Sequence, residues 1–344
     1  MVTLPLFILM FLLFRFRLGK LRAERHWRES RVRKMDELGS IKSLQILPLI
    51  DWRTNEEELM SEAGVSLLIK ADENTILFDV GYNPEQKDPS PLLHNMNFLG
   101  VTVDEIDTIF ISHNHVDHVG GMKFMKQKSF SLTGRQIPLR NKMVYTPIPM
   151  TYPHLKPICA ENPTVISKGV ASIGAISNQL FFLGWTPEQA LACSVEGKGI
   201  VLIVGCGHQK LPKIIARTEA LFKEPIYGIV GGLHYPVTGG RDSILGIPLE
   251  KYVGTGKVPW RPITMNEVFR NIQLLKTRKP QIVALSGHDS CDVSLLAFRE
   301  AFPNAYKDIR VGKSIVIESL GGKNILYNKL GGSFHGKSRQ KNGD

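Results

Sequence analysis

The stretch Ile111–Gly121, ISHNHVDHVGG, gathers imidazole and carboxylate side chains directly after the apolar run Ile109–Ile111. Burying polar groups at this density is costly unless a charge partner is present, so a merely solvated loop explains the pattern poorly. Imidazole is a common zinc ligand, and carboxylate suits harder metals. We therefore expect a metal site here, with enough ligands for two adjacent cations: His113, His115, Asp117 and His118.

Three more apolar runs end in metal-binding residue types. IVLIVG leads to Cys206 and His208, IYGIVGG leads to His234, and IVALSG leads to His288. The loops beyond strand ends in open α/β sheets are exposed while the strands hold them rigid, and ligands bind there. The alternation of such strands with helix-like segments favours an α/β protein whose strand ends meet at one site.

The charge distribution argues against a nucleic-acid-binding body. The formal net charge of the 344 residues is +11. Nine Arg or Lys stand against two Glu between Arg15 and Lys34, and four basic residues stand against Asp344 in the tail, so the body between is close to neutral. A phosphate-tracking surface needs a basic patch on the fold itself. The four cysteines lack a CxxC pattern, which favours a reducing compartment.

The first residues, MVTLPLFILMFLLF, are apolar and are followed by the basic cluster RFRLGKLRAERHWRESRVRK. The stretch is shorter than the roughly 20 residues that usually span a bilayer, and it lacks the basic start of a secretory signal. We expect an uncleaved anchor, either a short tilted span or an in-plane segment, that binds membrane lipid. The basic cluster on its C-terminal side places the body on the cytoplasmic side.

The chain is expected to divide into three parts. Residues 1–34 form the hydrophobic and basic anchor, residues 35–327 form the metal-binding domain, and residues 328–344 form a disordered basic tail. Within the domain, Arg241–Pro262 is a long insertion punctuated by Gly and Pro, typical of a lid or a binding loop. QLFFLGW is expected to be a strand, and the proline-rich Asn141–Pro163 to be irregular.

H-x-H-x-D-H after an apolar strand resembles the signature of the metallo-β-lactamase fold superfamily. The resemblance implies a four-layer αβ/βα sandwich, and members are mostly metal-dependent hydrolases. It also implies that Asp79, in ILFDVG, orients the histidine-rich loop without binding the metal itself. His288 would be the last metal-binding histidine along the chain. The usual third-motif histidine is missing from GWTPEQALA, so we expect His208 to complete the first site. Cys206 stands where the bridging aspartate is usual, either as a ligand or as a small buried residue.

Within that superfamily the chain looks most like the dihydropterin–ribofuranosylaminobenzene-phosphate synthase-like group. Gly-Cys-Gly-His at 205–208 and Gly-Gly-Leu-His at 231–234 are similar to that group's motifs, and Gly-His-Asp-Ser-Cys at 287–291 is a looser match. This resemblance implies a pterin-related synthase or transferase as one alternative. Phosphate binding would then need basic groups near the site, and the sequence offers Lys123, Lys210, Arg241 and Lys251 as candidates.

We expect a binuclear hydrolase that uses a metal-bound hydroxide on a phosphorylated, ester or lactone-type small molecule. One ion would be held by His113, His115 and His208, and the other by Asp117, His118 and His288. Zinc is the expected metal, with manganese or iron as alternatives. Asp117 is also a candidate proton acceptor, while His234 could bind metal, bind substrate or donate a proton. A non-catalytic membrane-associated metal-binding protein is the remaining alternative.

Overall fold

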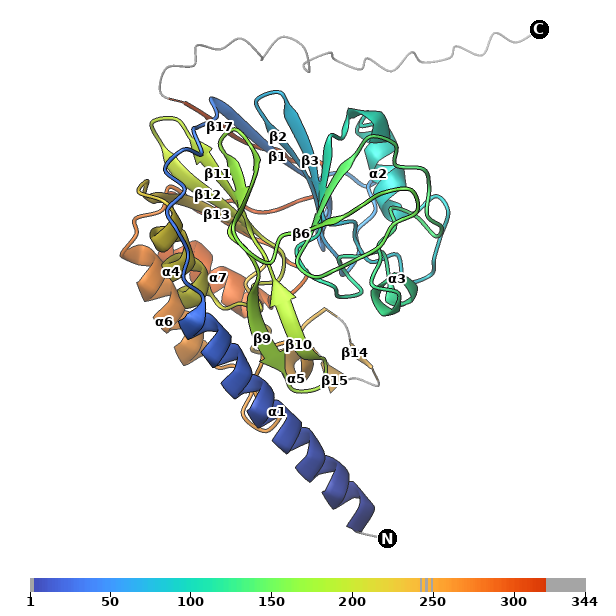
Figure 1. The fold of residues 1–344 in the computed structure, drawn as a ribbon, viewed down its shortest axis with the longest axis vertical. Coiled ribbons are helices and arrows are strands. Elements are labelled where there is room, and N and C mark those ends of the chain that lie inside the picture. Colours follow the sequence, from blue (N-terminus) through green and yellow to red (C-terminus); the bar gives the residue numbers. More distant parts are fainter. Residues whose placement is uncertain (1–2, 242, 245–246, 249, 320–344) are drawn as a thin grey trace, which may run out of the picture.

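The computed structural model describes residues 3–241, 243–244, 247–248 and 250–319. Its body contains two large β-sheets (Figure 1). The first has the strand order β17-β1-β2-β3-β4-β5-β6. Strands β3 to β6 run parallel, and β1, β2 and β17 pair antiparallel. The strands are β1 (Ser43–Ile50), β2 (Ser66–Ala71), β3 (Asn74–Phe78), β4 (Thr108–Phe110), β5 (Met143–Thr146), β6 (Ile158–Cys159) and β17 (Ile315–Glu318).

The second sheet has the order β16-β13-β12-β11-β8-β7, with β12, β13 and β16 parallel. Its strands are β7 (Thr164–Ser167), β8 (Val170–Ser172), β11 (Leu191–Val195), β12 (Gly199–Val204), β13 (Ile226–Gly231) and β16 (Ile282–Leu285). Because β12 is buried on both faces, its sequence GIVLIV is apolar without alternation. Leu202 packs toward the helices, while Val201 and Ile203 pack between the sheets.

Helices cover the outer face of each sheet, which gives four layers. An apolar cluster joins the first sheet to α2 (Pro91–Phe98) and α3 (Met122–Lys126), with η1 (Val103–Glu105) beside them. A second cluster joins the other sheet to α4 (Leu211–Leu221), α6 (Met265–Lys276) and α7 (Asp292–Ala301). A third cluster fills the space between the sheets. The predicted αβ/βα sandwich is confirmed.

The N-terminal segment forms a single helix, α1 (Thr3–Glu29). Its second half packs on a separate hairpin, β9 (Ile176–Leu180) and β10 (Gly184–Glu188), and its first half projects from the body (Figure 1). Phe16 is only 8% exposed, and its ring centroid lies 5.4 Å from that of Phe181. Among the described residues, no helix combines the length and the apolar character needed to cross a bilayer.

Two local predictions were wrong. QLFFLGW is not one strand, because the chain turns at residues 181–183 and returns as β10. The proline-rich segment 141–163 contains β5, which extends the first sheet by pairing in parallel with β4. The insertion contains short elements, among them β14 (Ser243–Ile244), β15 (Ile247–Pro248) and α5 (Glu250–Val253). The basic tail and the expected boundary after residue 327 lie outside the described residues, and all four cysteines are free.

Removing the Phe16 ring should loosen α1 from the body. A buried Phe→Ala change costs about 3–5 kcal/mol, whereas Phe14 on the same helix is 63% exposed and has little packing to lose. We expect Phe16→Ala to speed trypsin cleavage within α1 at least several-fold, and Phe14→Ala to leave it near the parent rate. Equal cleavage rates in the two variants would show that Phe16 does not hold the helix in place.

Candidate metal centre

Asp79 holds the histidine-rich loop in place through hydrogen bonds. Asp79 directly follows β3, with a left-handed φ of 57° and a fully buried side chain. Its Oδ1 accepts a hydrogen bond from the Ser112 backbone N–H at 2.7 Å, and its Oδ2 accepts one from Ser112 Oγ at 2.6 Å. Oδ2 also lies 2.6 Å from His118 Nδ1. The His118 ring is thereby fixed with Nε2 directed away from Asp79, as in many metal-binding histidines.

Glu188 plays the same part for the loop after β12. It is fully buried at the end of β10, and its carboxylate accepts hydrogen bonds from the backbone N–H groups of Cys206, Gly207 and His208 at 3.0, 2.8 and 2.6 Å. Burial raises the pKa of Glu188 to about 7, against the opposing effect of these donors. Glu188 lies in GWTPEQALA, where the expected histidine was missing, and it holds the substitute, His208, in position.

Two further buried carboxylates support the remaining histidines. Ser286 Oγ bonds to Asp51 Oδ2 and lies 2.6 Å from His288 Nδ1, and Asp51 Oδ1 accepts from the Gly287 N–H. Asp289 Oδ2 accepts from the His234 N–H at 2.8 Å. Burial raises the pKa of Asp51 to about 6 and that of Asp289 well above its usual value. Sequence analysis missed Asp51. The signal that could have revealed it is an acidic residue directly after the apolar run SLQILPLI.

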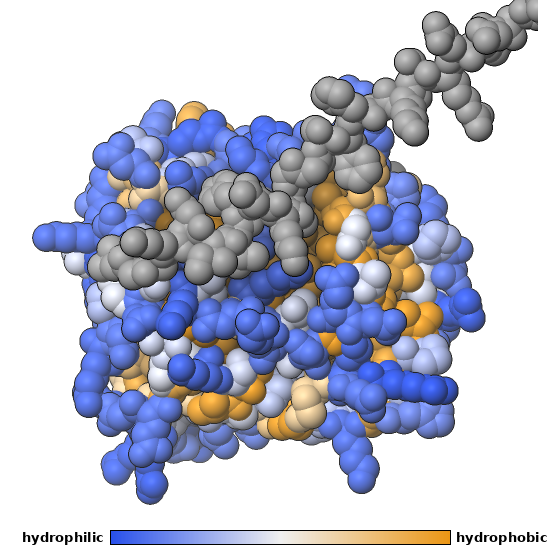
Figure 2. Space-filling view, turned by 90° about the horizontal axis from the view of Figure 1, so that it is seen from above, coloured by the Kyte–Doolittle hydropathy of each residue, from blue (hydrophilic) through white to orange (hydrophobic). Residues whose placement is uncertain are grey.

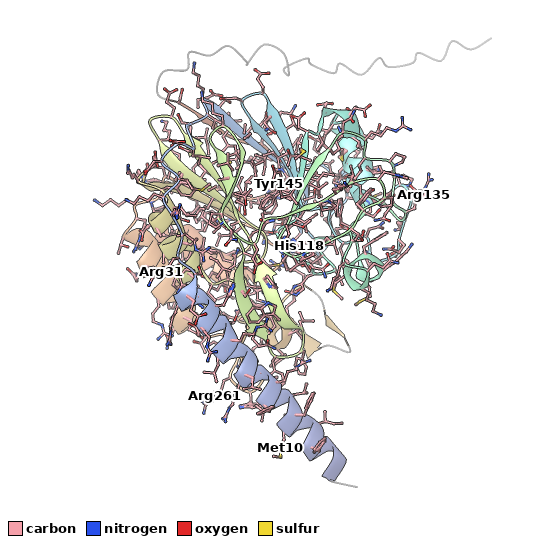
Figure 3. The ribbon with its side chains drawn as sticks, viewed as in Figure 1. Met10, Arg31, His118, Arg135, Tyr145 and Arg261 are labelled. Atoms are coloured by element: carbon pink, nitrogen blue, oxygen red, sulfur yellow. The ribbon has the colours of Figure 1, made fainter. Side chains whose placement is uncertain are left out.

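These supports bring the expected ligands together in two clusters. The ligand atoms of one cluster lie within 4.8 Å of one another, and so do those of the other. One contains His113, His115 and His208, and the other contains Asp117, His118, Cys206 and His288. Figure 3 places His118 in the interior of the body. These sets coincide with the two ligand sets expected from the sequence, with Cys206 added to the second.

Cys206 lies where the clusters meet. Its Sγ is 3.0 Å from His118 Nε2, 3.1 Å from His288 Nε2 and 3.8 Å from Asp117 Oδ2. Cys206 also forms a third group with His208 and His234, again within 4.8 Å. His234 therefore adjoins the first cluster through His208.

The nitrogen, oxygen and sulfur atoms of these residues are better satisfied by bound metal ions than by hydrogen bonds to one another. His113 Nε2 and both ring nitrogens of His234 are buried with no hydrogen-bond partner among the described residues. Such atoms are costly unless a ligand completes them. Burial, followed by the neighbouring histidines, lowers the pKa of His113 well below its usual value, and burial lowers that of His115 to about 4. Neutral imidazoles beside carboxylates and a thiol are a donor set suited to zinc.

His118 is an exception among these histidines. Burial acts to lower its pKa, but the flanking carboxylates of Asp117 and Asp79 raise it well above its usual value. His118 Nε2 lies 3.2 Å from Asp117 Oδ2, and its Nδ1 lies 2.6 Å from Asp79 Oδ2. The surroundings of His118 therefore favour positive charge, which a bound cation would also supply.

Both clusters open into a cavity of about 250 Å³. Its lining includes the polar residues Asp117, Cys206, His208, His234 and His288 and the apolar residues Val116, Met122, Met125, Leu183 and Val253. The insertion closes one side. Gly254 accepts a hydrogen bond from His208 Nδ1 at 2.9 Å, and a Cβ at Gly254 would lie 2.1 Å from His234 Nε2, so only glycine fits there.

Glu188→Ala should destabilise the fold and the site together. Three buried N–H groups would lose their acceptor, at about 1–3 kcal/mol for each group left without a partner. We expect a lower urea midpoint and a lower metal content. The control is Glu196→Ala, which removes an exposed carboxylate at a turn near the start of β12. A parent-like midpoint and metal content in Glu188→Ala would contradict the supporting role.

Comparison with known proteins agrees with this geometry. The family model described as Metallo-beta-lactamase superfamily matches residues 62–136. The curated 7,8-dihydropterin-6-methyl-4-(beta-D-ribofuranosyl)-aminobenzene-5'-phosphate synthase of Methanocaldococcus jannaschii is 22% identical over 267 residues, which cover 64% of this chain and 87% of that protein. The solved structure of Tm1679, a metal-dependent hydrolase of the beta-lactamase superfamily, superposes with a TM-score of 0.54 at 19% identity, covering 80% of this chain and 100% of that one. The chain therefore matches the metallo-β-lactamase superfamily model over residues 62–136 and shares the fold of a solved member of that superfamily.

Proposed function

We propose that this protein is a binuclear metal-dependent hydrolase, with zinc as the metal. The observation that carries the proposal is the pair of ligand clusters that meet at Cys206, each with its ligand atoms within 4.8 Å of one another. Three histidines in one cluster, and two histidines with a thiol and a carboxylate in the other, form a donor set typical of zinc. In this proposal Cys206 is a ligand of the second ion, and it also lies close to His208 of the first cluster.

Two side chains of the cavity are suited to handling protons and substrate. Bound divalent ions supply Lewis acidity and lower the pKa of a water ligand to about 7. Asp117 is the acidic ligand with an exposed edge, its side chain being 22% exposed. Burial opposes its ionisation, but His118 and then His288 hold its pKa well below the usual range, so it is charged and can orient a proton donor. His234 faces the same cavity, and burial lowers its pKa to about 4, which keeps its imidazole neutral.

The cavity supports a substrate with an apolar part next to the group to be cleaved. Methionine, valine and leucine side chains line the cavity together with the polar residues of the clusters, and Met122 and Leu183 are 50% and 48% exposed. Ligand sites commonly combine apolar walls with a few polar groups that fix orientation. A phosphorylated, ester or lactone-type small molecule fits this division.

A second candidate is a pterin-related synthase or transferase. It is favoured by the likeness to the Methanocaldococcus jannaschii synthase, which extends over 87% of that protein. The identity of 22% is low, and substrate-contacting loops vary most within a shared fold. The insertion from Arg241 onward lies against His208 and His234, so it is the segment in which the two candidates would differ.

Elemental analysis of the full chain tests the metal centre. We expect close to two transition-metal ions per chain, with at least one lost in His115→Ala and in His208→Ala, together with turnover of a generic phosphodiester or lactone. The control is His154→Asn, since His154 is exposed, lies outside the clusters and has a left-handed backbone that Asn tolerates.

Each other outcome is informative. Metal retained in His208→Ala would remove this residue from the ligand set. A metal-free parent protein would overturn the hydrolase proposal and favour a binding protein. Two ions without hydrolysis, but with condensation of a pterin and a phosphorylated donor, would favour the synthase.

We further propose that the free half of α1 attaches the protein to a membrane surface on its cytoplasmic side. Eight large apolar side chains of α1 are exposed: Phe7, Ile8, Leu9, Met10, Phe11, Phe14, Leu18 and Leu21. Met10 lies on the projecting part of the helix (Figure 3), whereas the face of the body seen from above is mainly hydrophilic (Figure 2). Basic residues follow the apolar ones, and anionic headgroups attract such residues at about 1 kcal/mol each.

Vesicle sedimentation tests the attachment. The full chain should bind vesicles containing phosphatidylserine, and binding should weaken with salt. Replacing Phe7, Phe11 and Phe14 together by Ser should reduce partitioning about tenfold or more, because their apolar area no longer enters the bilayer. The control is Phe269→Ser, which removes one exposed Phe from α6. Equal partitioning of the triple variant and the parent would contradict the proposal.

A further inference from the structure

A second cavity of about 220 Å³ adjoins the metal cavity. The two share three lining residues, His208, His234 and Gly254. The second cavity contains no candidate metal cluster of its own among the described residues. Its charged lining residues are Lys210, Lys257, Arg270 and Glu267, so three basic groups stand against one acidic group. Of the four phosphate contacts expected from the sequence, Lys210 is the one that lines a cavity beside the metal clusters.

A fourth cationic group reaches this region from α1. Lys20 Nζ donates to Asn178 Oδ1 at 2.6 Å, and Asn178 Nδ2 donates to the backbone oxygen of His208 at 2.6 Å. A Cβ on Gly256, in the insertion, would lie 3.1 Å from Lys20 Nζ. The N-terminal helix thus extends a lysine to the junction of β9, the insertion and the His208 loop.

The lysines here outnumber their carboxylate partners. Lys213 Nζ lies 2.7 Å from Glu24 Oε1, and Lys257 is paired with Glu267. Within the described ranges, neither Lys20 nor Lys210 has a carboxylate oxygen within 4.0 Å. Burial, and then repulsion from Lys210 and Lys213, lowers the pKa of Lys20 to about 7. Burial, and then Lys257, also lowers the pKa of Lys210. The surroundings therefore disfavour the charged forms of both lysines, and a bound anion would stabilise those forms.

The start of α4 adds to the positive potential. This 11-residue helix begins directly after Lys210, whose backbone has a φ of 73° and whose side chain makes no capping hydrogen bond. The N-terminus of a helix carries a partial positive charge that favours anions. In α4 this charge is the main contribution, because Pro212 has no N–H and the N–H groups of Lys213 and Ile214 already bond to the Lys210 oxygen. The helix end and the lysine cluster point to the same class of ligand.

We propose that the basic cavity, lined by Lys210 and Lys257 and completed by Lys20, binds the phosphate monoester of the substrate while the metal clusters act on another bond of the same molecule. The proposal rests on the proposed hydrolase function, because it places the second half of that enzyme's substrate. It assigns Lys20 and Lys210 as binding residues and makes α1 part of the site.

Calorimetric titration of phenyl phosphate into the full, metal-loaded chain tests this assignment. We expect binding that weakens about tenfold or more in Lys20→Met and in Lys210→Met, since each change removes a charge-assisted contact. Lys20→Arg and Lys210→Arg should recover most of the affinity. The control Lys276→Met removes an exposed lysine at the end of α6 and should bind like the parent.

Further arms separate this site from the metals and from lipid. His115→Ala should keep phenyl phosphate binding, and the lysine variants should keep the parent's metal content. Unchanged affinity in both lysine variants, with metal and hydrolysis intact, would overturn the inference and leave the hydrolase standing. If the parent protein contained no metal but bound phenyl phosphate through the two lysines, the hydrolase proposal would be overturned and the phosphate site would stand. Lysine-dependent binding of phosphatidate vesicles, but not of phenyl phosphate, would assign the cavity to a lipid headgroup and overturn the assignment to a small molecule.

Discussion

Buried carboxylates accepting backbone hydrogen bonds hold the centre of this molecule together. Asp79, Glu188 and Asp289 each accept at least one N–H from a loop that carries candidate ligands, and Asp51 does so for the His288 loop. A carboxylate removed from water is unfavourable unless such donors and nearby cations compensate it. The apolar strands hold the carboxylates in place, and the carboxylates in turn hold the imidazoles at the distances that metal binding requires.

The site divides into two regions of opposite charge. On one side, carboxylates and a thiol surround histidines that burial keeps neutral, with His118 as the exception. On the other side, lysines exceed their acidic partners. His208 and His234 stand between the two regions and line both cavities. A substrate that presents an electron-rich reacting group at one end and an anion at the other would find a complementary surface at each.

The sequence predicted the layers and the ligand-type residues because both have local signals. Cys206, His234 and His288 follow β12, β13 and β16, so their convergence follows from parallel strands of the second sheet ending at one edge. His113 follows β4 of the first sheet, and it meets them because the two sheets pack together. The supporting contacts have no such signal. Asp51 and Ser286 are 235 residues apart and meet only in the folded chain. The turn inside QLFFLGW was missed because it is apolar, and it is apolar because Phe181 packs against Phe16 and Trp260.

The contact between Lys20 and Asn178 ties the N-terminal helix to the chemistry of the body. A helix without contacts to the body could be lengthened, exchanged or cleaved with no effect on the candidate site. Here the same helix contributes a cation beside His208, and Ser30, directly after the helix, accepts a hydrogen bond from the Arg217 guanidinium. A chain shortened to begin at Met35 would therefore lose a cation beside His208 as well as the exposed apolar half of the helix. Substitutions on the docked face of the helix would therefore affect the site, whereas substitutions on its exposed half would not reach it.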